Sequence, residues 1–438
     1  MTEFLKRPTA QEQGVDGGIR HTVEEMIGRI EREGLEAVRH YSRELDGWAP
    51  GSFRVGEEEV AAASAELSPE LRDHIAFAQE QVRGFAERQL ETLVDLEVET
   101  QPGVVLGHRQ IPVGAVGAYV PGGRYPMLAS SFMTVLVAKV AGVDRVVACA
   151  PPWQGQGIHP AMLHAISTSG ADEILCLGGV QALAAMAFGV GEGAPVDMLV
   201  GAGNAYVAEA KRQLFGRVGI DLLAGPTEIL LIADGTADPE LVAVDLLGQA
   251  EHGPTSPAIL ISTSGELAER AMAEIDRLLE LPSTAEIAGR AWRDHGAVAV
   301  VSSRDEAIRL ADEYAPEHLE VQVSEDELDA YLAGLRNYGS LFLGREATVA
   351  YGDKAVGTNH VLPTARAARY TGGLWVGKFL KTVTYQRLTA EGTRRVAPAV
   401  AAICDAEMFE GHALTARLRL ERLSAEARPR DVHVTTGD

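Results

Sequence analysis

The sequence predicts a protein of the α/β class with mainly parallel sheets, and two observations lead to this prediction. From about Ile111 onward, short apolar runs alternate with helical segments, which is the pattern of strand–helix–strand units. These runs are apolar throughout, which is typical of parallel strands buried on both faces. With 438 residues, 46% of them hydrophobic, the chain is long enough for two or three domains.

The first part of the chain predicts an arm followed by helices. Residues 1–18 are polar and contain glycine, so we expect an arm. Thr22 can cap a helix whose apolar positions extend to Val38. Ser68-Pro69 opens a further helix, because proline is tolerated at a first helical position. Neither helix carries evident chemistry.

The alternating part of the chain predicts six buried strands. They are residues 146–150, 174–177, 198–200, 229–232, 259–262 and 298–301. Helices are expected between most of them, as at residues 128–141, 160–168 and 204–215. From about Leu374 the pattern turns helical, and its strongest segment is residues 398–423.

Glycine clusters follow four strand-like stretches, at residues 114–117, 121–123, 178–179 and 201–203. Such turns let a backbone approach phosphate groups at helix N-termini. None of the clusters fits the full G-x-G-x-x-G fingerprint in its usual place. Ordinary turns between strands and helices explain them equally well.

A helix–turn–strand at residues 305–323 places a carboxylate beside an imidazole. Pro316 must end the preceding helix, and the alternation of Leu319 and Val321 with polar residues predicts a half-buried strand. Glu317 has the parity of the apolar residues, so its carboxylate faces the interior if the strand begins that early. Glu317 and His318 could then form an acid/base pair. A solvated glutamate and an incidental histidine at a turn are the alternative.

Three further polar groups could carry chemistry. Gln249 and His252 share the last turn of a helix that begins at Asp238-Pro239, where they could hold a metal ion, although the helix dipole alone also favours a histidine there. Residues 351–364 are expected to form a loop that carries a carboxylate and an imidazole. Glu407 and His412 are five residues apart in the C-terminal helix, and so lie on different faces unless Gly411 distorts it. No local metal-binding spacing joins these histidines.

Composition excludes several classes of function. The net charge of −23 argues against nucleic acid and anionic membranes as partners. The first residues lack the apolar core of a secretory signal, and no run of 18 apolar residues occurs. Three cysteines without a C-x-x-C pair suit a reducing compartment. We therefore expect a cytoplasmic protein.

Motifs along nearly the whole chain resemble the histidinol dehydrogenase family. They are residues 119–123, 203–211, 225–228, 249–254, 315–320, 352–353 and 357–364, which occur in the family's order.

The resemblance implies one zinc ion per active site, NAD, and a homodimer with shared sites. Glu317 and His318 match the family's acid/base residues, and Tyr119, Gln181 and Asn204 match positions along NAD. The zinc ligands would be Gln249, His252, Asp353 and His412, with His412 supplied by the partner subunit. The substrate-contacting positions would be Thr227, Gln249, His252, His318, Asp353, His360, Glu407 and His412.

The resemblance also divides the chain into two Rossmann-like domains. Residues 19–118 and 228–373 would form the main domain with the zinc and acid/base residues, and residues 119–227 the NAD-binding domain. Residues 374–438 would be the helical segment exchanged in the dimer.

The implied reaction oxidises a primary alcohol through an aldehyde to a carboxylate in two hydride transfers. Lys354, Val356 and residues 124–127, 338–344, 370–374 and 407–412 depart from ordinary members and look more like the sulfopropanediol dehydrogenase branch. Added Lys and Arg suit a sulfonate, so we expect oxidation of sulfopropanediol to sulfolactate. Oxidation of L-histidinol to L-histidine is the alternative, since Glu407 is kept. A noncatalytic binding protein and a zinc hydrolase without NAD are more remote. Cys149 invites a thiohemiacetal role, but the end of an apolar strand favours a structural thiol.

Overall fold

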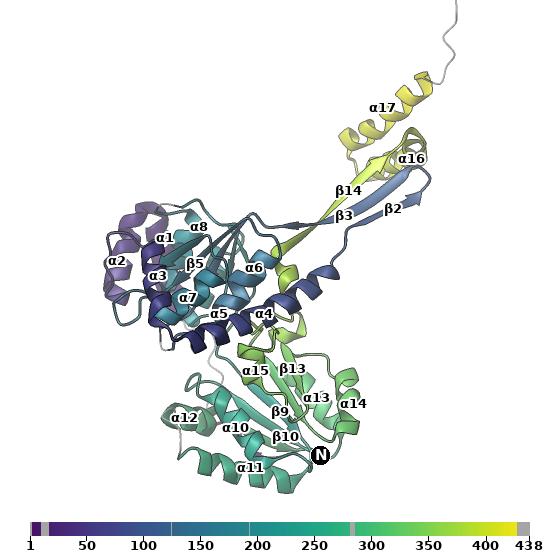
Figure 1. Ribbon diagram of the computed structural model, residues 1–438. Helices are drawn as coiled ribbons and strands as arrows, with labels where there is room; N and C mark the ends of the chain where they lie inside the picture. Colours follow the sequence, from purple (N-terminus) through teal and green to yellow (C-terminus); the bar gives the residue numbers. More distant parts are fainter. Residues whose placement is uncertain (1, 10–16, 124, 192, 281–284, 427–438) are drawn as a thin grey trace, which may run out of the picture. The chain divides into compact units, whose positions relative to one another are not determined.

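The computed structural model describes residues 2–9, 17–123, 125–191, 193–280 and 285–426. The chain divides into two compact units. Unit 1 consists of residues 1–90 and 112–379, and unit 2 of residues 91–111 and 380–438. Unit 1 contains two sheets and unit 2 contains a third (Figure 1).

The first sheet of unit 1 has six strands in the order β1-β11-β10-β9-β12-β13. The strands are β1 (Glu3–Lys6), β9 (Ile229–Ala233), β10 (Ala258–Ser262), β11 (Ala297–Val300), β12 (His318–Gln322) and β13 (Ser340–Leu343). All neighbours pair in parallel except β1, which pairs antiparallel with β11. The described part of the expected arm is therefore an edge strand of this sheet.

Helices cover both faces of the six-stranded sheet because its central strands are apolar on both sides. Ile229 and Leu231 of β9 pack into a cluster with α10 (Pro239–Ala250), α11 (Gly265–Leu278) and α12 (Ala285–His295). The alternate residues Leu230 and Ile232 pack with α13 (Arg304–Tyr314) and α14 (Leu328–Gly334). This alternation is the two-residue period of a strand.

Strand β12 was expected to be half-buried, and this prediction is wrong. Glu320 and Gln322, expected on the solvent side, are 0% and 2% exposed. The strand lies between β9 and β13 in the sheet interior, so both of its faces are covered. The polar residues of β12 are therefore buried groups that need internal partners.

The second sheet of unit 1 has five parallel strands in the order β6-β5-β4-β7-β8. Helices α1, α2, α8 and α9 share one apolar cluster with this sheet, and α7 packs against α3 and α5. The strands are β4 (Ala115–Tyr119), β5 (Arg145–Ala150), β6 (Glu173–Cys176), β7 (Met198–Val200) and β8 (Gly219–Ile220). The helices are α1 (Gly17–Glu33), α2 (Leu35–Asp46), α3 (Glu57–Glu66), α4 (Pro69–Glu91), α5 (Ala129–Ser131), the π-helix η1 (Phe132–Leu136), α6 (Val137–Val140), α7 (Pro160–Thr168), α8 (Gly179–Phe188) and α9 (Ala205–Leu214).

The predicted α/β class with parallel sheets is confirmed, and each of the six predicted strands is present within one or two residues. The helix expected from Thr22 to Val38 is instead two helices. Gly34 separates them with a φ of 61°, in the left-handed region that glycine adopts without strain. The domain boundaries also differ from the expected ones, because β4, α1 and α2 belong to the five-stranded sheet. The apolar stripe of a helix does not specify which sheet it covers.

Short helices connect the remaining parts of unit 1. They are η2 (Glu325–Glu327), α15 (Val349–Lys354), η3 (Ala367–Arg369) and η4 (Val376–Phe379). Residues 351–354, expected in a loop, are thus the end of a helix. No described helix of the chain is long and apolar enough to cross a membrane.

Unit 2 contains a three-stranded sheet and two helices (Figure 1). The sheet order is β14-β3-β2, with β2 (Leu96–Gln101), β3 (Val104–Pro112) and β14 (Leu380–Leu388). The helices are α16 (Ala390–Ala406) and α17 (Glu410–Glu426). The segment expected to be helical from Leu374 therefore contains a strand, and its helix breaks at Met408, which has a φ of 60°.

Candidate active site

A buried carboxylate lies at the start of β12. Helix α13 ends where Ala315 adopts a left-handed φ of 52°, directly before Pro316, as the proline predicted. Glu317 follows and is 6% exposed. Its Oε2 accepts hydrogen bonds from the Thr227 hydroxyl at 2.5 Å and from the Glu228 backbone N–H at 3.0 Å. Glu317 is therefore buried and hydrogen-bonded, and the alternative of a solvated glutamate at a turn is wrong.

His318, the first residue of β12, has one nitrogen engaged and one free. Its Nδ1 lies 3.0 Å from the carbonyl oxygen of Glu228, and since a carbonyl only accepts, Nδ1 carries the proton. Its Nε2 is buried and has no hydrogen-bond partner among the described residues. Two carboxylates flank the ring, with Glu317 Oε2 3.4 Å from Nδ1 and Asp353 Oδ1 3.6 Å from Nε2.

Two opposing effects act on the pKa of His318. Burial by itself lowers this pKa, but the neighbouring Glu317 and Asp353 carboxylates outweigh burial and hold the pKa well above its ordinary value. The imidazole is thus a strong base in a dry environment.

Gln249 and Asp353 flank the imidazole of His318. Gln249 lies in the last turn of α10, where its amide donates to the Thr227 hydroxyl and lies 3.4 Å from His318 Nδ1. Asp353 is in the last turn of α15 and is 8% exposed. Burial by itself raises the pKa of Asp353, but His318 and His360 outweigh it and hold this pKa below its ordinary range.

Burial shifts the other two histidines near Asp353 toward their neutral form. His252 follows the end of α10 by two residues, and burial lowers its pKa. His360 is fixed by two hydrogen bonds, from Nδ1 to the Asp353 carbonyl oxygen at 2.9 Å and between Nε2 and the Ser130 hydroxyl at 3.1 Å. Burial lowers the pKa of His360 as well.

The protonation states of this cluster fit a divalent metal ion. A metal ion needs neutral imidazoles and ionised carboxylates, and the lowered pKa values of His252 and Asp353 favour these two forms. Gln249 adds an amide oxygen beside them. Within the described residues, His, Cys, Asp and Glu side chains form no group of three that could hold a metal. Unit 1 therefore offers two such ligands and an amide, which is one protein ligand short of a closed tetrahedral site.

The NAD-associated positions lie at the carboxyl ends of the five-stranded sheet. Tyr119 ends β4, Gln181 lies in the first turn of α8 after β6, and Asn204 caps α9 after β7. The Tyr119 hydroxyl accepts from the Gly179 N–H at 3.5 Å. Gln181 donates to Asp46 at 2.8 Å, while its Oε1 is buried without a partner among the described residues. This edge of a parallel sheet is where dinucleotides bind.

A buried ion pair fixes one loop at that edge. Lys211, 1% exposed, forms an ion pair with Asp221 and donates to the Gly201 carbonyl oxygen at 2.9 Å. Asp221 also accepts from the Gly201 N–H at 2.7 Å. Gly201 has a φ of 113°, and a Cβ there would collide with the carbonyl oxygen of Tyr119. The turn thus requires glycine for close backbone packing.

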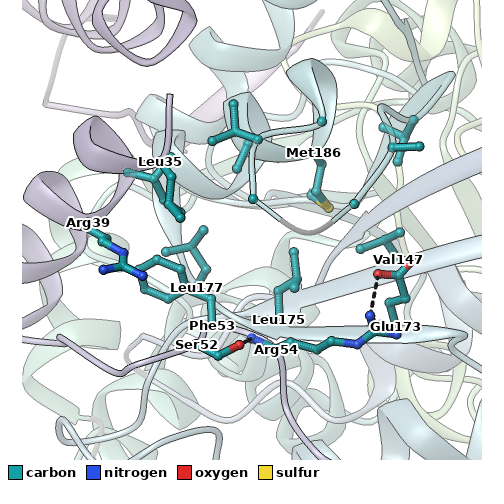
Figure 2. A pocket seen from close by; sticks show the side chains of 18 of the residues that line it. Leu35, Arg39, Ser52, Phe53, Arg54, Val147, Glu173, Leu175, Leu177 and Met186 are labelled. Atoms are coloured by element: carbon teal, nitrogen blue, oxygen red, sulfur yellow. Dashed lines mark hydrogen bonds and ion pairs between the residues drawn. The ribbon is translucent and has the colours of Figure 1, made fainter. Parts of the chain in front are cut away.

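A cavity of about 90 Å³ lies at the opposite, amino edge of the five-stranded sheet (Figure 2). Arg145 and Arg54 both pair with Glu173 at its rim, at 3.2 and 3.7 Å. Its walls are apolar and include Leu35, Phe53, Leu175, Leu177 and Met186. None of the predicted site residues lines this cavity, so it is separate from the candidate active site.

Glu407 and His412 belong to unit 2, where both are exposed. Glu407 caps the end of α16, and His412 lies in the first turn of α17 with its ring 5.4 Å from that of Phe409. The two residues do not share one helix, because the helix breaks at Met408. Gly411 does not cause this break. The structure thus brings together the predicted zinc, acid/base and substrate residues of unit 1, which are Thr227, Gln249, His252, Glu317, His318, Asp353 and His360, and places Glu407 and His412 on another unit.

The residues that depart from ordinary members of the family differ in how close they lie to the candidate site. Lys354 is exposed at the end of α15, close enough to Asp353 and His360 for its charge to lower both of their pKa values. Val356 is also exposed. Arg124 lies outside the described residues. Cys149 is fully buried, and burial raises its pKa, so a thiohemiacetal role is excluded by inaccessibility.

Sequence reasoning missed two residues of this site. Glu228 is buried beside Glu317, and burial, together with the Glu317 charge, raises its pKa to about 7. Its position directly before an apolar strand could have indicated it. Ser130, which contacts His360, lies 230 residues away in sequence and carries no such signal.

This geometry, a buried His–Glu pair beside candidate metal ligands on an α/β scaffold, is that of an oxidoreductase or a metal-assisted enzyme. The sequence profile of the histidinol dehydrogenase family matches residues 8–420. The chain belongs to the histidinol dehydrogenase family, whose members are NAD-dependent dehydrogenases that oxidise alcohols.

Three similar proteins illustrate the range of the family. A histidinol dehydrogenase homolog of Shouchella clausii is 54% identical, over 96% of this chain and 99% of its own length. The sulfopropanediol 3-dehydrogenase of Ruegeria pomeroyi is 47% identical, over 96% of both chains. The crystal structure of histidinol dehydrogenase from Elizabethkingia anophelis superposes with a TM-score of 0.89 at 32% identity, over 96% of this chain and 95% of that one.

Proposed function

We propose that this protein is a zinc- and NAD-dependent dehydrogenase that oxidises a small polar primary alcohol through an aldehyde to a carboxylate. The observation that carries this proposal is the state of His318. Its Nδ1 is held by the Glu228 carbonyl, while its Nε2 is buried without a partner among the described residues. A base that is fixed through one nitrogen and free at the other is suited to accept a proton from a bound substrate.

Two oxidation steps follow from these roles. In the first, the alcohol carbon gives a hydride to NAD⁺ and the hydroxyl proton goes to His318 Nε2, which leaves an aldehyde. In the second, water adds to the aldehyde, and the hydrate gives a second hydride to another NAD⁺ to yield the carboxylate. One alcohol and one water thus give one carboxylate, two NADH and three protons.

Glu317 is the group proposed to take a proton from the attacking water. Its Oε2 is saturated by Thr227 and the Glu228 N–H, while its Oε1 accepts no hydrogen bond from the described residues. A carboxylate anchored by one oxygen can present the other to water. Burial favours this role because it keeps competing solvent away.

The proposed zinc ligands are Gln249, His252 and Asp353 of one subunit and His412 of its partner. The protonation states of His252 and Asp353 support this set. A zinc ion there would polarise the alcohol oxygen and offset the Asp353 charge, which lowers the pKa of His318 toward the range of a working base.

A homodimer is proposed because the remaining ligand lies on unit 2. Around His412, the side chains of Ile403, Met408 and Phe409 are 57%, 86% and 56% exposed. Apolar side chains gathered this way are typical of a surface that a partner covers. A second copy of the chain is the partner that would place His412 and Glu407 in a site. Three free cysteines support a reducing compartment, so we place the protein in the cytoplasm.

Sulfopropanediol is the proposed substrate, with sulfolactate as the product. Lys354 supports a sulfonate, because its ammonium group acts on Asp353 and His360 and adds a cation beside the site of a strongly acidic protein. The 47% identity to a sulfopropanediol 3-dehydrogenase supports the same choice. L-histidinol is the second candidate, favoured by the retained Glu407 and by the similarity to a histidinol dehydrogenase structure.

The test is NADH formation from sulfopropanediol, L-histidinol and other small polar alcohols, with stoichiometry recorded. We expect two NADH per sulfopropanediol and a higher kcat/KM for it than for histidinol. Lys354→Gln should raise the KM for sulfopropanediol and spare that for histidinol, whereas Arg270→Gln, which removes an exposed charge from α11, should change neither. A higher kcat/KM for histidinol would overturn the substrate assignment, and NADH formation from none of the alcohols would overturn the function.

A further inference from the structure

The helices α10 and α15 and the strand β12 carry the residues around the proposed base, His318. Each of these three elements carries a second polar group, which lies four residues away on a helix and two residues away on the strand. We call the row at the site the upper rung, which consists of Gln249 on α10, His318 on β12 and Asp353 on α15. The lower rung consists of Asp245 on α10, Glu320 on β12 and the N-terminal end of α15 at Thr348 and Val349.

The spacing of the two rungs is the same on all three elements. Asp245 and Gln249 are four residues apart on α10, and Val349 and Asp353 are four residues apart on α15, which is about 6 Å along a helix axis. On β12 they are two residues apart, which is about 6.6 Å along a strand and keeps both side chains on one face. The two rungs therefore cross the same three elements side by side.

The lower rung is held by short hydrogen bonds. The Val349 N–H donates to Glu320 Oε1 at 2.8 Å, and the Thr348 hydroxyl donates to Asp245 Oδ1 at 2.9 Å. The Gln322 amide donates to Asp245 Oδ2 at 2.8 Å, and the Asp245 and Glu320 carboxyl groups are hydrogen-bonded to each other. These contacts join α10, β12 and α15 in one connected network.

The contact between the two carboxyl groups requires a proton. No ion pair reaches Asp245 or Glu320 from the described residues, so two negative charges would face each other in a buried setting. Burial and then the charge of Asp245 raise the pKa of Glu320 to about 8. One shared proton turns the repulsion into a hydrogen bond.

The members of the upper rung make no such contacts with one another, although the Gln249 amide donates to the Thr227 hydroxyl, which in turn donates to Glu317. Gln249 lies 3.4 Å from His318 Nδ1, and Asp353 lies 3.6 Å from His318 Nε2. Both distances exceed an ordinary hydrogen bond, and neither can define the position of a helix. The lower rung therefore supplies the direct contacts between α10, β12 and α15 that the upper rung lacks.

We propose that Asp245 and Glu320 are a positioning pair, whose hydrogen bonds to Gln322, Thr348 and Val349 set the register of α10 and α15 against β12. It would hold Gln249 and Asp353 at the separation that a metal ion needs on either side of His318. Asp245 and Glu320 act through these residues and touch neither substrate nor cofactor. The inference rests on the proposed function, since it takes the upper rung as the metal and base row.

The test compares two substitutions of Glu320 by the zinc affinity of the purified full chain, measured by competition with a chromophoric chelator. Glu320→Ala removes the acceptor for the Val349 N–H and the partner of Asp245, and should weaken zinc binding about 10–100-fold. Glu320→Gln keeps an acceptor for Val349 and a donor to Asp245, and should stay within a few-fold of wild type. Equal affinity in wild type and Glu320→Ala would overturn the proposal, as would an equal loss in both variants.

Two further variants separate positioning from general destabilisation. Val321→Ala removes buried volume from the opposite face of the same strand, so it should lower the unfolding free energy and leave zinc affinity unchanged. Thr348→Val removes a single hydrogen bond at nearly constant shape, and should weaken zinc binding several-fold even if Glu320→Ala does not fold. A zinc affinity that falls in Val321→Ala as much as in Thr348→Val would overturn the proposal.

His252→Ala distinguishes failure of this inference from failure of the proposed function. If His252→Ala leaves zinc binding unchanged, or wild type binds no zinc, the proposed metal site is wrong. If His252→Ala abolishes zinc binding while Thr348→Val and Glu320→Ala leave it intact, the positioning role alone is wrong.

Discussion

Unit 1 and unit 2 differ in how completely they bury their own apolar side chains. In unit 1, both sheets are covered by clusters of fully buried aliphatic residues. In unit 2, the cluster among the described residues consists of Ala397, Ala401 and Ala416 with Leu420 against it. Alanine side chains contribute little apolar area, so unit 2 gains little stability from its own core. Among the described residues, unit 1 therefore has much the larger apolar core.

The candidate site residues follow the same division. Those of unit 1 are mostly buried and hydrogen-bonded, which fixes their geometry within one subunit. Glu407 and His412 of unit 2 are exposed among apolar side chains. The comparison teaches that the buried acid/base pair lies wholly within unit 1, while unit 2 carries Glu407 and His412 on its surface.

The largest expected effect tests whether unit 1 holds the acid/base chemistry. His318→Asn should slow alcohol–aldehyde interconversion in both directions by about 10²–10⁴-fold, because it removes the positioned base. Glu317→Gln should slow aldehyde oxidation by a similar factor and spare the reduction of aldehyde to alcohol. Single-turnover absorbance of NADH from alcohol and from aldehyde measures both. Equal losses in every half-reaction for Glu317→Gln would assign it an orienting role instead.

The next effect compares the two cores directly with the same substitution. Leu230→Ala removes a side chain that is 1% exposed in β9 and should lower the unfolding free energy by about 2–5 kcal/mol. Leu420→Ala removes a half-buried side chain from the unit 2 cluster and should cost less than about 1 kcal/mol. Denaturant titration of both variants gives the difference. Comparable losses would show that unit 2 has a core as strong as that of unit 1.

A third experiment asks whether unit 2 serves another copy. His412→Ala and His252→Ala subunits should each be inactive, but in a mixed dimer one site has both ligands intact. Random mixing should therefore restore about a quarter of wild-type activity. Two subunits that both carry His252→Ala are the control and should stay inactive. No recovery despite hybrids seen by native mass spectrometry would place His412 in the site of its own subunit.

The smallest effect concerns pH and the buried acid of unit 1. The folded-state pKa of Glu320, about 8, lies above its ordinary value of 4.5, so the folded state keeps a proton that the unfolded state loses. The contribution of this group to stability therefore falls as pH rises from about 4.5 to about 8. Glu320→Gln removes this contribution, and should flatten the change in urea midpoint between those pH values. An unchanged pH dependence in the variant would contradict the shared proton.

The elements that could be predicted from the sequence are those that are buried. Strands such as β7 and β9 were found because a strand covered on both faces is apolar at every position. Strand β2 was missed because all six of its residues are exposed and its alternation of Leu96 and Val98 with glutamates is short. Helix α15 was mistaken for a loop because its sequence contains glycine and polar residues that favour turns. The lower rung could not be predicted from the sequence, because Glu320, like Gln322, has the position of a solvent-facing residue in a half-buried strand.

Less of the candidate site than of the fold could be predicted from the sequence by physical reasoning. Strand parity predicted a buried Glu317 beside His318, and Glu317 is buried, but parity is not the reason, because β12 begins at His318 and both of its faces are covered. The grouping of Gln249, His252, Asp353 and His360 came from the resemblance to a family, since no spacing in the sequence connects α10 with α15. The contact of His360 with Ser130 depends on tertiary packing across two sheets, which no local pattern encodes.

All three cysteines are buried, so the reaction of each thiol with a labelling reagent reports on the opening of its own unit. Cys149 and Cys176 lie in unit 1 and Cys404 lies in unit 2, and each is free. A maleimide can react with such a thiol only while its surroundings open transiently, so the rate of labelling measures the free energy of that opening. Because the core around Cys404 is the weaker one, we expect its thiol to be alkylated first. Storage of the protein in air should likewise oxidise Cys404 before the other two.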